Sequence, residues 1–554
     1  MSNVFEVLLR LLSEAGVQHI FGVPGDAINE LTEAIRTQNK IRFIHVAHEE
    51  SGGFAAVGQA KLTGRLGVCA GTAGPGAIHL LNALYDAKCD RVPVLAITGQ
   101  VATSMLGSSY QQEVDLISLF NNVTVYNQMV TNPENFACQA AQAIQTAIER
   151  SGVAHLNIPL DVAAKTVPHA DRWRLHLPYR NVVQGNREPV LQAIELLNQS
   201  DRVVILAGLG CNGAAERVYT LAERLYAPVI HALRAKELFP ESHPYSIGGL
   251  GMLGVKPAMK AIERCDALIM IGTNFPYADF LPRHAKIIQI DLDPCQLGKH
   301  MPVDIAIAGD SGAVIDKLLE RLEPKTDKRF LQQMQDETKR WKEQVQREVT
   351  DLSVPIKPQR LAHLIGELAT ENAIFVCDTG EVTAWAARYL SIKAGQRFII
   401  SGMLATMAFS LGAAIGAKLA YPKRQVIAIT GDGGFTMLMA DFATAVRYGL
   451  AIVFVIFNNK RLGMIRIEQE ARGMPETQTS LHNPDFAAFA RACGGDGMQV
   501  TEAQDLENAI TQGMKSAKPF IVDVVIDETE KIIPPHIKLS QAANYSIAKI
   551  KEIL

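Results

Sequence analysis

The sequence predicts an α/β protein made of three doubly wound parallel sheets. Along residues 1–175, 190–325 and 340–530, short apolar or β-branched runs alternate with segments of helical periodicity, which is the pattern of repeated βαβ units. The chain has 554 residues, and about three to four domains are expected at this length. Residues 531–554 are expected to form a C-terminal tail.

Composition and charge exclude several classes of protein. A net charge of −3 provides no basic footprint for nucleic acid. The eight cysteines are scattered without a CxxC pair, which is typical of reduced thiols in a cytoplasmic protein. No apolar run approaches the roughly 20 residues of a membrane span, and the amphipathic start of the chain does not have the pattern of a signal peptide.

The most informative pattern lies between residues 426 and 459. A β-branched run leads into Gly431-Asp432-Gly433-Gly434, helical periodicity covers 435–448, and a second apolar run, 452–457, stops at Asn458-Asn459. This order predicts a strand, a glycine turn, a helix and a parallel strand joined by a right-handed crossover.

This βαβ unit has the features of a magnesium and diphosphate site. The start of the helix after Gly434 offers unpaired N–H groups, and glycines allow a ligand to approach the backbone closely. Asp432 and Asn459 leave the tips of neighbouring strands, so their oxygens are expected to converge as ligands for Mg²⁺. A second Gly-Asp-Gly, at 495–497, has no following strand and asparagine pair and is interpreted as an ordinary turn.

Glu49 is the candidate acid or base of the N-terminal unit. It follows a predicted strand, 41–46, and precedes a helix start rich in small residues, 51–56. A carboxylate at a strand end could hydrogen-bond a flat ligand there. Position alone leaves a helix-capping or surface role equally open, and Glu50 is the alternative base.

The central unit carries a weaker nucleotide pattern. A strand at 203–207 runs into Gly208, Gly210 and Gly213, which fit GxGxxG, and Asp291 ends a strand as a ribose-binding acid would. A domain without a ligand remains the alternative. Residues 168–189 are expected to be an interdomain linker, and the highly charged stretch 323–358 a solvated helix between domains.

The glycine turn followed by the asparagine pair resembles the thiamine-diphosphate motif of enzymes related to pyruvate oxidase, acetolactate synthase and pyruvate decarboxylase. The run His48-Glu49-Glu50 resembles the N-terminal signature of the same family. The combination of HALRAKE, GTNFPY and IIQIDLDP resembles the FAD-binding domain of pyruvate oxidases, and the C-terminus resembles bacterial pyruvate:quinone oxidoreductases. The resemblance covers essentially the whole chain.

The resemblance implies roles for particular residues around thiamine diphosphate. Glu49 would activate the aminopyrimidine ring by acid–base catalysis, Met407 would prop the cofactor into its bent shape, and the Arg461 carbonyl would join Asp432 and Asn459 on Mg²⁺. Gln112, Met464 and Glu468 would lie near the substrate. The full set implied for this cofactor is Ala405, Thr406, Met407, Asp432, Gly433, Gly434, Asn459, Lys460, Arg461, Leu462, Gly463, Met464 and Ile465.

The same resemblance implies that FAD binds the central domain. The residues expected to line it are Arg234, Leu250, Gly251, Met252, Leu253, Thr273, Asn274, Phe275, Pro276, Tyr277 and Asp291. In this family the N-terminal, aminopyrimidine-binding domain of one subunit faces the C-terminal, diphosphate-binding domain of another. A homotetramer, a dimer of dimers, is therefore expected.

The implied activity is oxidative decarboxylation of pyruvate to acetate and CO₂, with electrons passing from FAD to a quinone. One alternative is an acetolactate synthase in which FAD is structural, and another is a phosphate-dependent pyruvate oxidase that uses oxygen. A non-enzymatic binding module is the third class considered.

The sequence departs from the quinone-linked enzymes at three places. The chain stops at Leu554 and is expected to lack their C-terminal membrane-docking segment, so a peripheral membrane location is in doubt. Gln111 stands where the family commonly has phenylalanine. Met464 stands where related oxidases have an aromatic residue linked to electron transfer.

Overall fold

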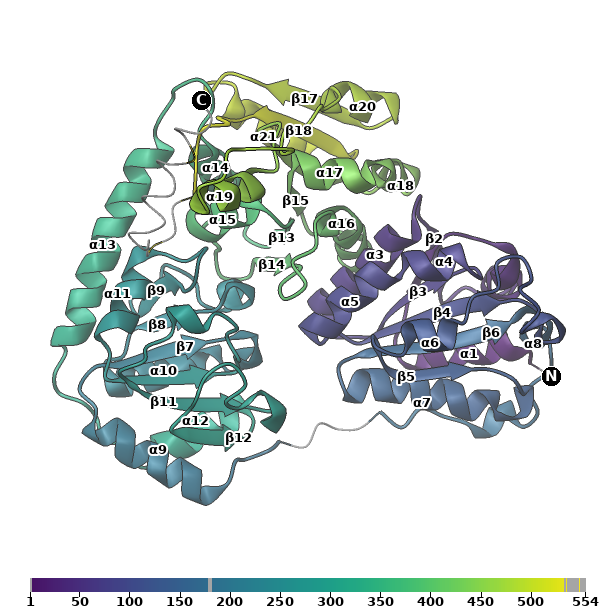
Figure 1. The fold of residues 1–554 in the computed structure, drawn as a ribbon, viewed down its shortest axis with the longest axis horizontal. Helices are drawn as coiled ribbons and strands as arrows, with labels where there is room; N and C mark the ends of the chain where they lie inside the picture. The colour runs from purple at the N-terminus through teal and green to yellow at the C-terminus, as the bar shows by residue number, and fades with distance from the viewer. Residues whose placement is uncertain (1, 178–181, 533–534, 536–547, 549–554) are drawn as a thin grey trace.

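The computed structural model describes residues 2–177, 182–532, 535 and 548, and it contains three six-stranded sheets with flanking helices (Figure 1). All recorded strand pairs within these sheets are parallel. The predicted fold class is therefore confirmed. The predicted limits of the three units stay predictions.

The N-terminal and C-terminal sheets share one topology. Numbered within each sheet, both have the strand order 2-1-3-4-6-5, so the switch point lies between the first and third strands, where ligands of such sheets bind. The N-terminal sheet runs β2 (Arg42–His45), β1 (His19–Gly22), β3 (Gly67–Gly71), β4 (Val94–Gln100), β6 (Val153–Pro159) and β5 (Thr124–Met129). The C-terminal sheet runs β14 (Arg397–Ile400), β13 (Ile374–Cys377), β15 (Val426–Gly431), β16 (Ile452–Asn458), β18 (Phe520–Val525) and β17 (Asp496–Val500).

The central sheet has the strand order typical of dinucleotide-binding folds. Its order is 3-2-1-4-5-6 when read from β9, which puts its switch point between the first and fourth strands. In space the sheet runs β9 (Ser246–Gly249), β8 (Val229–His231), β7 (Val203–Ala207), β10 (Ala267–Ile271), β11 (Lys286–Asp291) and β12 (Ile305–Ala308).

Helices cover both faces of each sheet. In the N-terminal unit the main ones are α1 (Val4–Glu14), α2 (Asn29–Arg36), α3 (Glu49–Thr63), α5 (Leu81–Asp90) and α7 (Phe136–Glu149). In the central unit they are α9 (Arg187–Gln199), α10 (Ala215–Leu225), α11 (Lys256–Arg264) and α12 (Ser311–Leu319). In the C-terminal unit they are α14 (Pro358–Leu368), α15 (Glu381–Tyr389), α16 (Phe409–Ala420), α19 (Gly463–Ala471), α20 (Phe486–Ala492) and α21 (Leu506–Lys515).

Helices α3 and α16 join the first and third units at the centre of the molecule (Figure 1). A Cβ on Gly412 would lie 2.4 Å from the Ser51 carbonyl oxygen, and one on Gly416 would lie 2.0 Å from that of Ala55. Only glycine allows the two backbones this approach. The small residues after Glu49 therefore serve helix packing, a role that the sequence pattern does not separate from a ligand surface.

Two predicted helices differ in detail. The single helix expected over 435–448 begins earlier and is divided, as α17 (Asp432–Leu438), a 3₁₀ turn η9 (Met439–Asp441) and α18 (Phe442–Arg447). Helix α13 (Arg329–Val349) connects the central and C-terminal units along one side (Figure 1). It is solvated on one face only, because Phe330, Leu331 and Met334 are buried.

Most positions of the predicted C-terminal tail, 531–554, lie outside the described residues. None of the helices in the described part of the chain combines the length and hydropathy that crossing a bilayer requires.

Candidate functional site

Asp432 and Asn459 leave the same edge of the C-terminal sheet. Strands β15 and β16 pair in parallel up to Gly431 and Phe457, so both residues follow directly at neighbouring strand ends. The buried Asp432 carboxylate accepts hydrogen bonds through Oδ2 from the Lys460 amide at 2.7 Å and from Asn483 Nδ2 at 2.7 Å. Asp432 thus reaches the loop that carries Asn459, and Asn483 is a partner that the motif spacing does not indicate.

Glu381 is a further carboxylate at this edge, and the motif spacing does not point to it. Asn459 donates from Nδ2 to Glu381 Oε2 at 3.1 Å, and its Oδ1 accepts from the Arg461 amide at 3.0 Å. Burial, which Arg466 opposes and nearby Asp432 reinforces, raises the pKa of Glu381 to about 7. A Cβ on Gly463 would lie 1.8 Å from Glu381 Oε2, so a larger residue there would require this carboxylate to move.

Asp378 follows strand β13 and is hydrogen-bonded to strand β15 at the switch point. It is 1% exposed and accepts hydrogen bonds from Thr430 Oγ1 at 2.8 Å and Ser410 Oγ at 3.1 Å. Burial raises the pKa of its carboxyl to about 6. A Cβ on Gly434 would lie 2.5 Å from Asp378 Oδ2, which explains one glycine of the turn by packing against the protein itself.

The glycines at the switch point leave unfilled space beside the oxygen donors. A Cβ on Gly380 or on Gly431 would meet no heavy atom within 4 Å. A carboxylate, an amide oxygen and open room for a phosphate group suit Mg²⁺ and a diphosphate. The residues present therefore fit the metal and the cofactor that the motif implies.

Met407 lies against the glycine turn. A Cβ on Gly433 would be 3.4 Å from Met407 Cε, 3.1 Å from Leu462 Cδ2 and 3.2 Å from Leu481 Cδ1. Ala405 and Ala408 flank Met407 with left-handed φ angles of 55° and 68°, a conformation that costs energy for a residue with a Cβ. The surrounding structure must hold this loop, which consists of residues 401–408 and is called the Met407 loop below.

The remaining residues predicted to bind the metal and thiamine diphosphate lie on the loop after β16 and on helix α19. The Arg461 guanidinium pairs with Glu476 and Glu528, and its amide donates to Asn459. Met464 on α19 is half-buried, whereas Ile465 and Glu468 are exposed.

A second group of predicted residues gathers around Glu49. Glu49 is the first residue of α3 and is buried, and its Oε2 lies 2.9 Å from His79 Nδ1. His79 stacks on His48 with ring centroids 4.3 Å apart. Exposed Gln112 has a φ of 65°, and its carbonyl oxygen would lie 2.9 Å from a Cβ on Gly74, in the turn that leads to His79. His79 is the functional candidate that the motifs do not single out.

Glu50, and not Glu49, faces the C-terminal unit within the chain. Asn82 Nδ2 donates to Glu50 Oε1 at 2.6 Å and to Thr406 Oγ1 at 3.0 Å. Among the described residues, no hydrogen bond or ion pair is recorded between Glu49 and either Asp432 or Asn459. Within the described part of the chain, Glu49 is therefore not bonded directly to the proposed metal ligands.

In the central unit, the predicted FAD segments meet at the carboxyl ends of the strands. A Cβ on Gly251 would be 3.4 Å from the Phe275 ring, which joins the segments 250–253 and 273–277. Nearby His231 Nε2, at the end of β8, is buried without a hydrogen-bond partner. Asp291, at the end of β11, is buried, and burial raises the pKa of its carboxyl. This orphaned nitrogen and the meeting of the two loops fit a bound nucleotide.

Some residues of the predicted nucleotide site in the central unit also have contacts within the protein itself. Cβ atoms on Gly208 and Gly210 would lie 2.3 Å from the Gly272 oxygen and 2.6 Å from its Cα, so these glycines are needed for packing β7 against β10. Arg234, one of the residues expected to line FAD, binds Asp90 of the N-terminal unit, at 2.8 Å to the carbonyl and 3.3 Å to the carboxylate.

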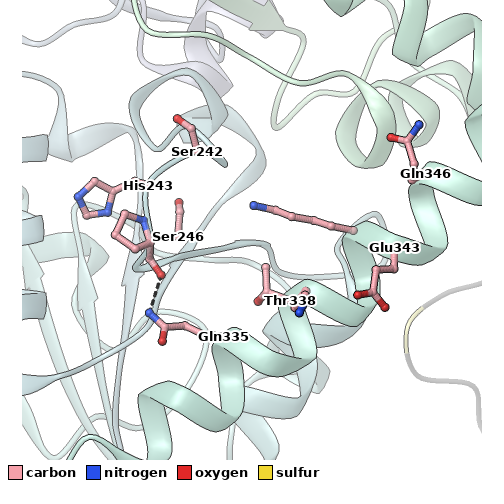
Figure 2. Close-up of a pocket in the computed structure, with 10 residues that line it drawn as sticks. Ser242, His243, Ser246, Gln335, Thr338, Glu343 and Gln346 are labelled. Atoms are coloured by element: carbon pink, nitrogen blue, oxygen red, sulfur yellow. Dashed lines mark hydrogen bonds between the residues drawn. The ribbon is translucent and has the colours of Figure 1, made fainter.

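A cavity of about 550 Å³ lies elsewhere, between the loop before β9 and helix α13 (Figure 2). Figure 2 shows polar side chains around it and the hydrogen bond from Gln335 to the Pro244 carbonyl, 3.1 Å long. None of the residues predicted from the motifs lines this cavity, so the candidate site is the pair of clusters described above.

The buried carboxyls predict how pH acts on the cofactor-free protein. Burial raises the pKa of Asp378 and Asp432 to about 6 and that of Glu381 to about 7. The folded state thus binds protons more tightly than the unfolded state. Protonation of these three carboxyls therefore adds to the free energy of unfolding. This stabilisation is complete below about pH 4 and is lost as pH rises through 6 to 7.

We expect urea unfolding of the cofactor-free protein to show stability falling between about pH 4 and 7, and Mg²⁺ with thiamine diphosphate to oppose that fall because metal ligands must be deprotonated. Asp378→Asn should flatten the profile, since one of the three titrating carboxyls is removed. A flat profile in the unsubstituted protein would contradict the expectation.

Comparison with known proteins adds three family matches. Thiamine pyrophosphate enzyme models match residues 2–119 (N-terminal TPP binding domain), 190–318 (central domain) and 378–524 (C-terminal TPP binding domain). A Bacillus subtilis protein, YdaP, described as thiamine pyrophosphate-containing, is 41% identical over 99% of this chain and 95% of its own. A protein of Methanocaldococcus jannaschii described as an acetolactate synthase large subunit is 34% identical over 96% of this chain and 93% of its own. Pyruvate oxidase of Lactiplantibacillus plantarum is 30% identical over 97% of this chain and 90% of its own.

Proposed function

Because this chain belongs to the thiamine pyrophosphate enzyme family, we propose that it is a thiamine-diphosphate-dependent enzyme that oxidatively decarboxylates pyruvate to acetate and CO₂, with FAD taking the electrons and a quinone receiving them. The observation that carries the proposal is the meeting of Asp432 with the Asn459 loop at a switch point with open glycines. Thiamine diphosphate, when bound, accepts the electron pair released as CO₂ leaves the 2-oxo acid.

The protein's own groups supply binding, orientation and proton transfer. Asp432, Asn459 and the Arg461 carbonyl would hold Mg²⁺ and, through it, the diphosphate. Met407 would press on the cofactor from beside Gly433, and Glu49 would exchange a proton with the aminopyrimidine ring. Gln112, Met464 and Glu468 are proposed to border the substrate.

A second copy of the chain would complete the site. Among the described residues, Glu49 is not bonded directly to Asp432 or Asn459. Each cluster also has an exposed apolar neighbour: Ile78 is 43% exposed beside His79, and Met437 on α17 is 58% exposed. These observations support a site shared between subunits and the homotetramer expected for the family. Light scattering of the purified protein would measure the assembly.

The proposed flavin chemistry is supported by the central sheet. The sheet has the strand order of dinucleotide-binding folds. At the carboxyl ends of its strands lie the joined segments 250–253 and 273–277, the orphaned His231 nitrogen and buried Asp291. The decisive experiment is anaerobic mixing of the FAD-loaded protein with pyruvate while flavin absorbance is followed. We expect bleaching with release of acetate, and reoxidation by an added quinone.

The main alternative is an acetolactate synthase, favoured by a relative described by that name that is aligned over 96% of the chain. Acetolactate formed without flavin bleaching would establish it in place of the oxidase. The L. plantarum relative, named pyruvate oxidase, keeps open an oxidase that uses oxygen and phosphate. Acetyl phosphate formed only when phosphate is added would identify that reaction.

A further inference from the structure

One buried ion cluster joins all three units of the chain. Lys61 of α3 donates from Nζ to Asp86 and to Asp90 of α5, each at 2.7 Å. Arg234 of the 3₁₀ helix η6 (Leu233–Leu238) reaches the Asp90 carboxylate at 3.3 Å. Both aspartate side chains are fully buried and that of Lys61 is 7% exposed. Two cations thus face two buried carboxylates, and of these groups Arg234 is the most exposed, at 25%.

The cluster is bonded directly to the Met407 loop. Lys61 Nζ also donates to the Ile400 carbonyl at 2.7 Å, just before the loop begins. The two Asp90 oxygens accept from the Gly402 and Met403 amides, both at 2.9 Å. Burial alone would raise the pKa of Asp90, but Lys61 and Arg234 outweigh burial and hold it below its usual value. Asp90 is therefore a fixed anion that pins the start of the loop.

A second set of bonds continues to the residue before Met407. Ser401 Oγ donates to Asp86 Oδ1 at 2.6 Å and accepts from the Thr406 amide at 3.0 Å. The Arg234 stem crosses the loop where a Cβ on Gly402 would be 2.3 Å from its Cδ. Since Ala405 and Ala408 are held in left-handed conformations, the loop needs such an external constraint to keep its shape.

We propose that the Lys61–Asp86–Asp90 cluster is the positioning element of the Met407 loop and that Arg234 extends it into the central domain. The inference rests on the proposed role of Met407 beside thiamine diphosphate. Residues outside the set proposed to contact thiamine diphosphate then affect its affinity, because the cluster presets the loop conformation that the cofactor requires. A change in the central domain that moves Arg234 would be felt at the cofactor.

The test compares two substitutions on the same short helix. Arg234→Gln removes the cation that meets the loop. Glu237→Gln is the matched control, because Glu237 also forms an interdomain pair, with Arg397 at 3.0 Å, but binds the start of β14 and not the loop. Ser401→Ala is the third variant; it cuts the link to Thr406 and leaves every charge in place.

Cofactor affinity is measured by isothermal titration of cofactor-free protein with thiamine diphosphate at saturating Mg²⁺, and the free energy of unfolding by urea. We expect Arg234→Gln and Ser401→Ala to weaken cofactor binding about tenfold, a loss of about 1.4 kcal/mol, while Glu237→Gln changes it less than about twofold at a similar cost in stability. Limited proteolysis should cut the loop near exposed Met403 faster in the first two variants.

Equal affinities in all three variants, or a loss that follows unfolding stability alone, would overturn the inference. The unsubstituted protein separates this outcome from failure of the proposed function: if it binds no thiamine diphosphate at all, the assigned cofactor is wrong. If it binds the cofactor and the variants do not differ, only the positioning role is lost.

Discussion

Asp432→Ala is expected to abolish Mg²⁺-dependent binding of thiamine diphosphate. The carboxylate supplies one of the proposed metal ligands, and it also accepts the Lys460 amide and Asn483 Nδ2, which fixes the loop that carries Asn459. Loss of a ligand together with its supporting bonds should weaken the apparent affinity by at least about 100-fold. Fluorescence titration with the cofactor, at increasing Mg²⁺, measures the loss.

The chain contains its own control for this substitution. Asp496 also stands in a Gly-Asp-Gly sequence and, like Asp432, accepts the amide of the following glycine, at 2.8 Å. It is exposed and begins β17 (Asp496–Val500), an edge strand, so the interpretation of 495–497 as an ordinary turn with no following strand was wrong. Asp496→Ala should leave cofactor affinity unchanged. Equal affinities in the two alanine variants would remove Asp432 from the metal site.

How far the sequence predicts this molecule depends on the range of each interaction. The βαβ unit from 426 to 459 could be predicted because hydrophobic periodicity and a glycine turn are local signals. The topology shared by the N-terminal and C-terminal sheets could not be predicted, because it depends on the pairing of strands that lie far apart in the sequence. The division of the helix at η9 was also missed, because Met439, Phe442 and Val446 fit one continuous periodic stripe.

The candidate site divides in the same way. Asp432 and Asn459 could be paired from their positions at two strand ends, since neighbouring parallel strands end at one edge. Glu381, Asp378 and Asn483 escape prediction because their partners lie 78, 52 and 51 residues away in the chain. Only the folded switch point brings them together, and the carboxylate that follows β13 was the one available signal.

Glu49→Gln is expected to separate cofactor activation from cofactor binding. Glutamine keeps the size of the side chain and can still bond His79, whose Nδ1 lies 2.9 Å from Glu49 Oε2, so α3 should keep its place. It cannot take up a proton. Loss of this acid–base step should slow exchange of the thiazolium C2 proton for deuterium by about 100-fold or more, while affinity changes only several-fold. Quenched-flow exchange followed by NMR measures the rate directly.

Glu50→Gln supplies the matched control, because it alters the adjacent carboxylate on the same turn of α3. Glu50 is engaged with Asn82, which also bonds Thr406, so its contacts lead to the Met407 loop of the same chain. Its substitution should leave the exchange rate near that of the unsubstituted protein. Slow exchange in Glu50→Gln with normal exchange in Glu49→Gln would transfer the base to Glu50. Because that carboxylate faces its own chain, the outcome would also remove the reason to require a second subunit at the site.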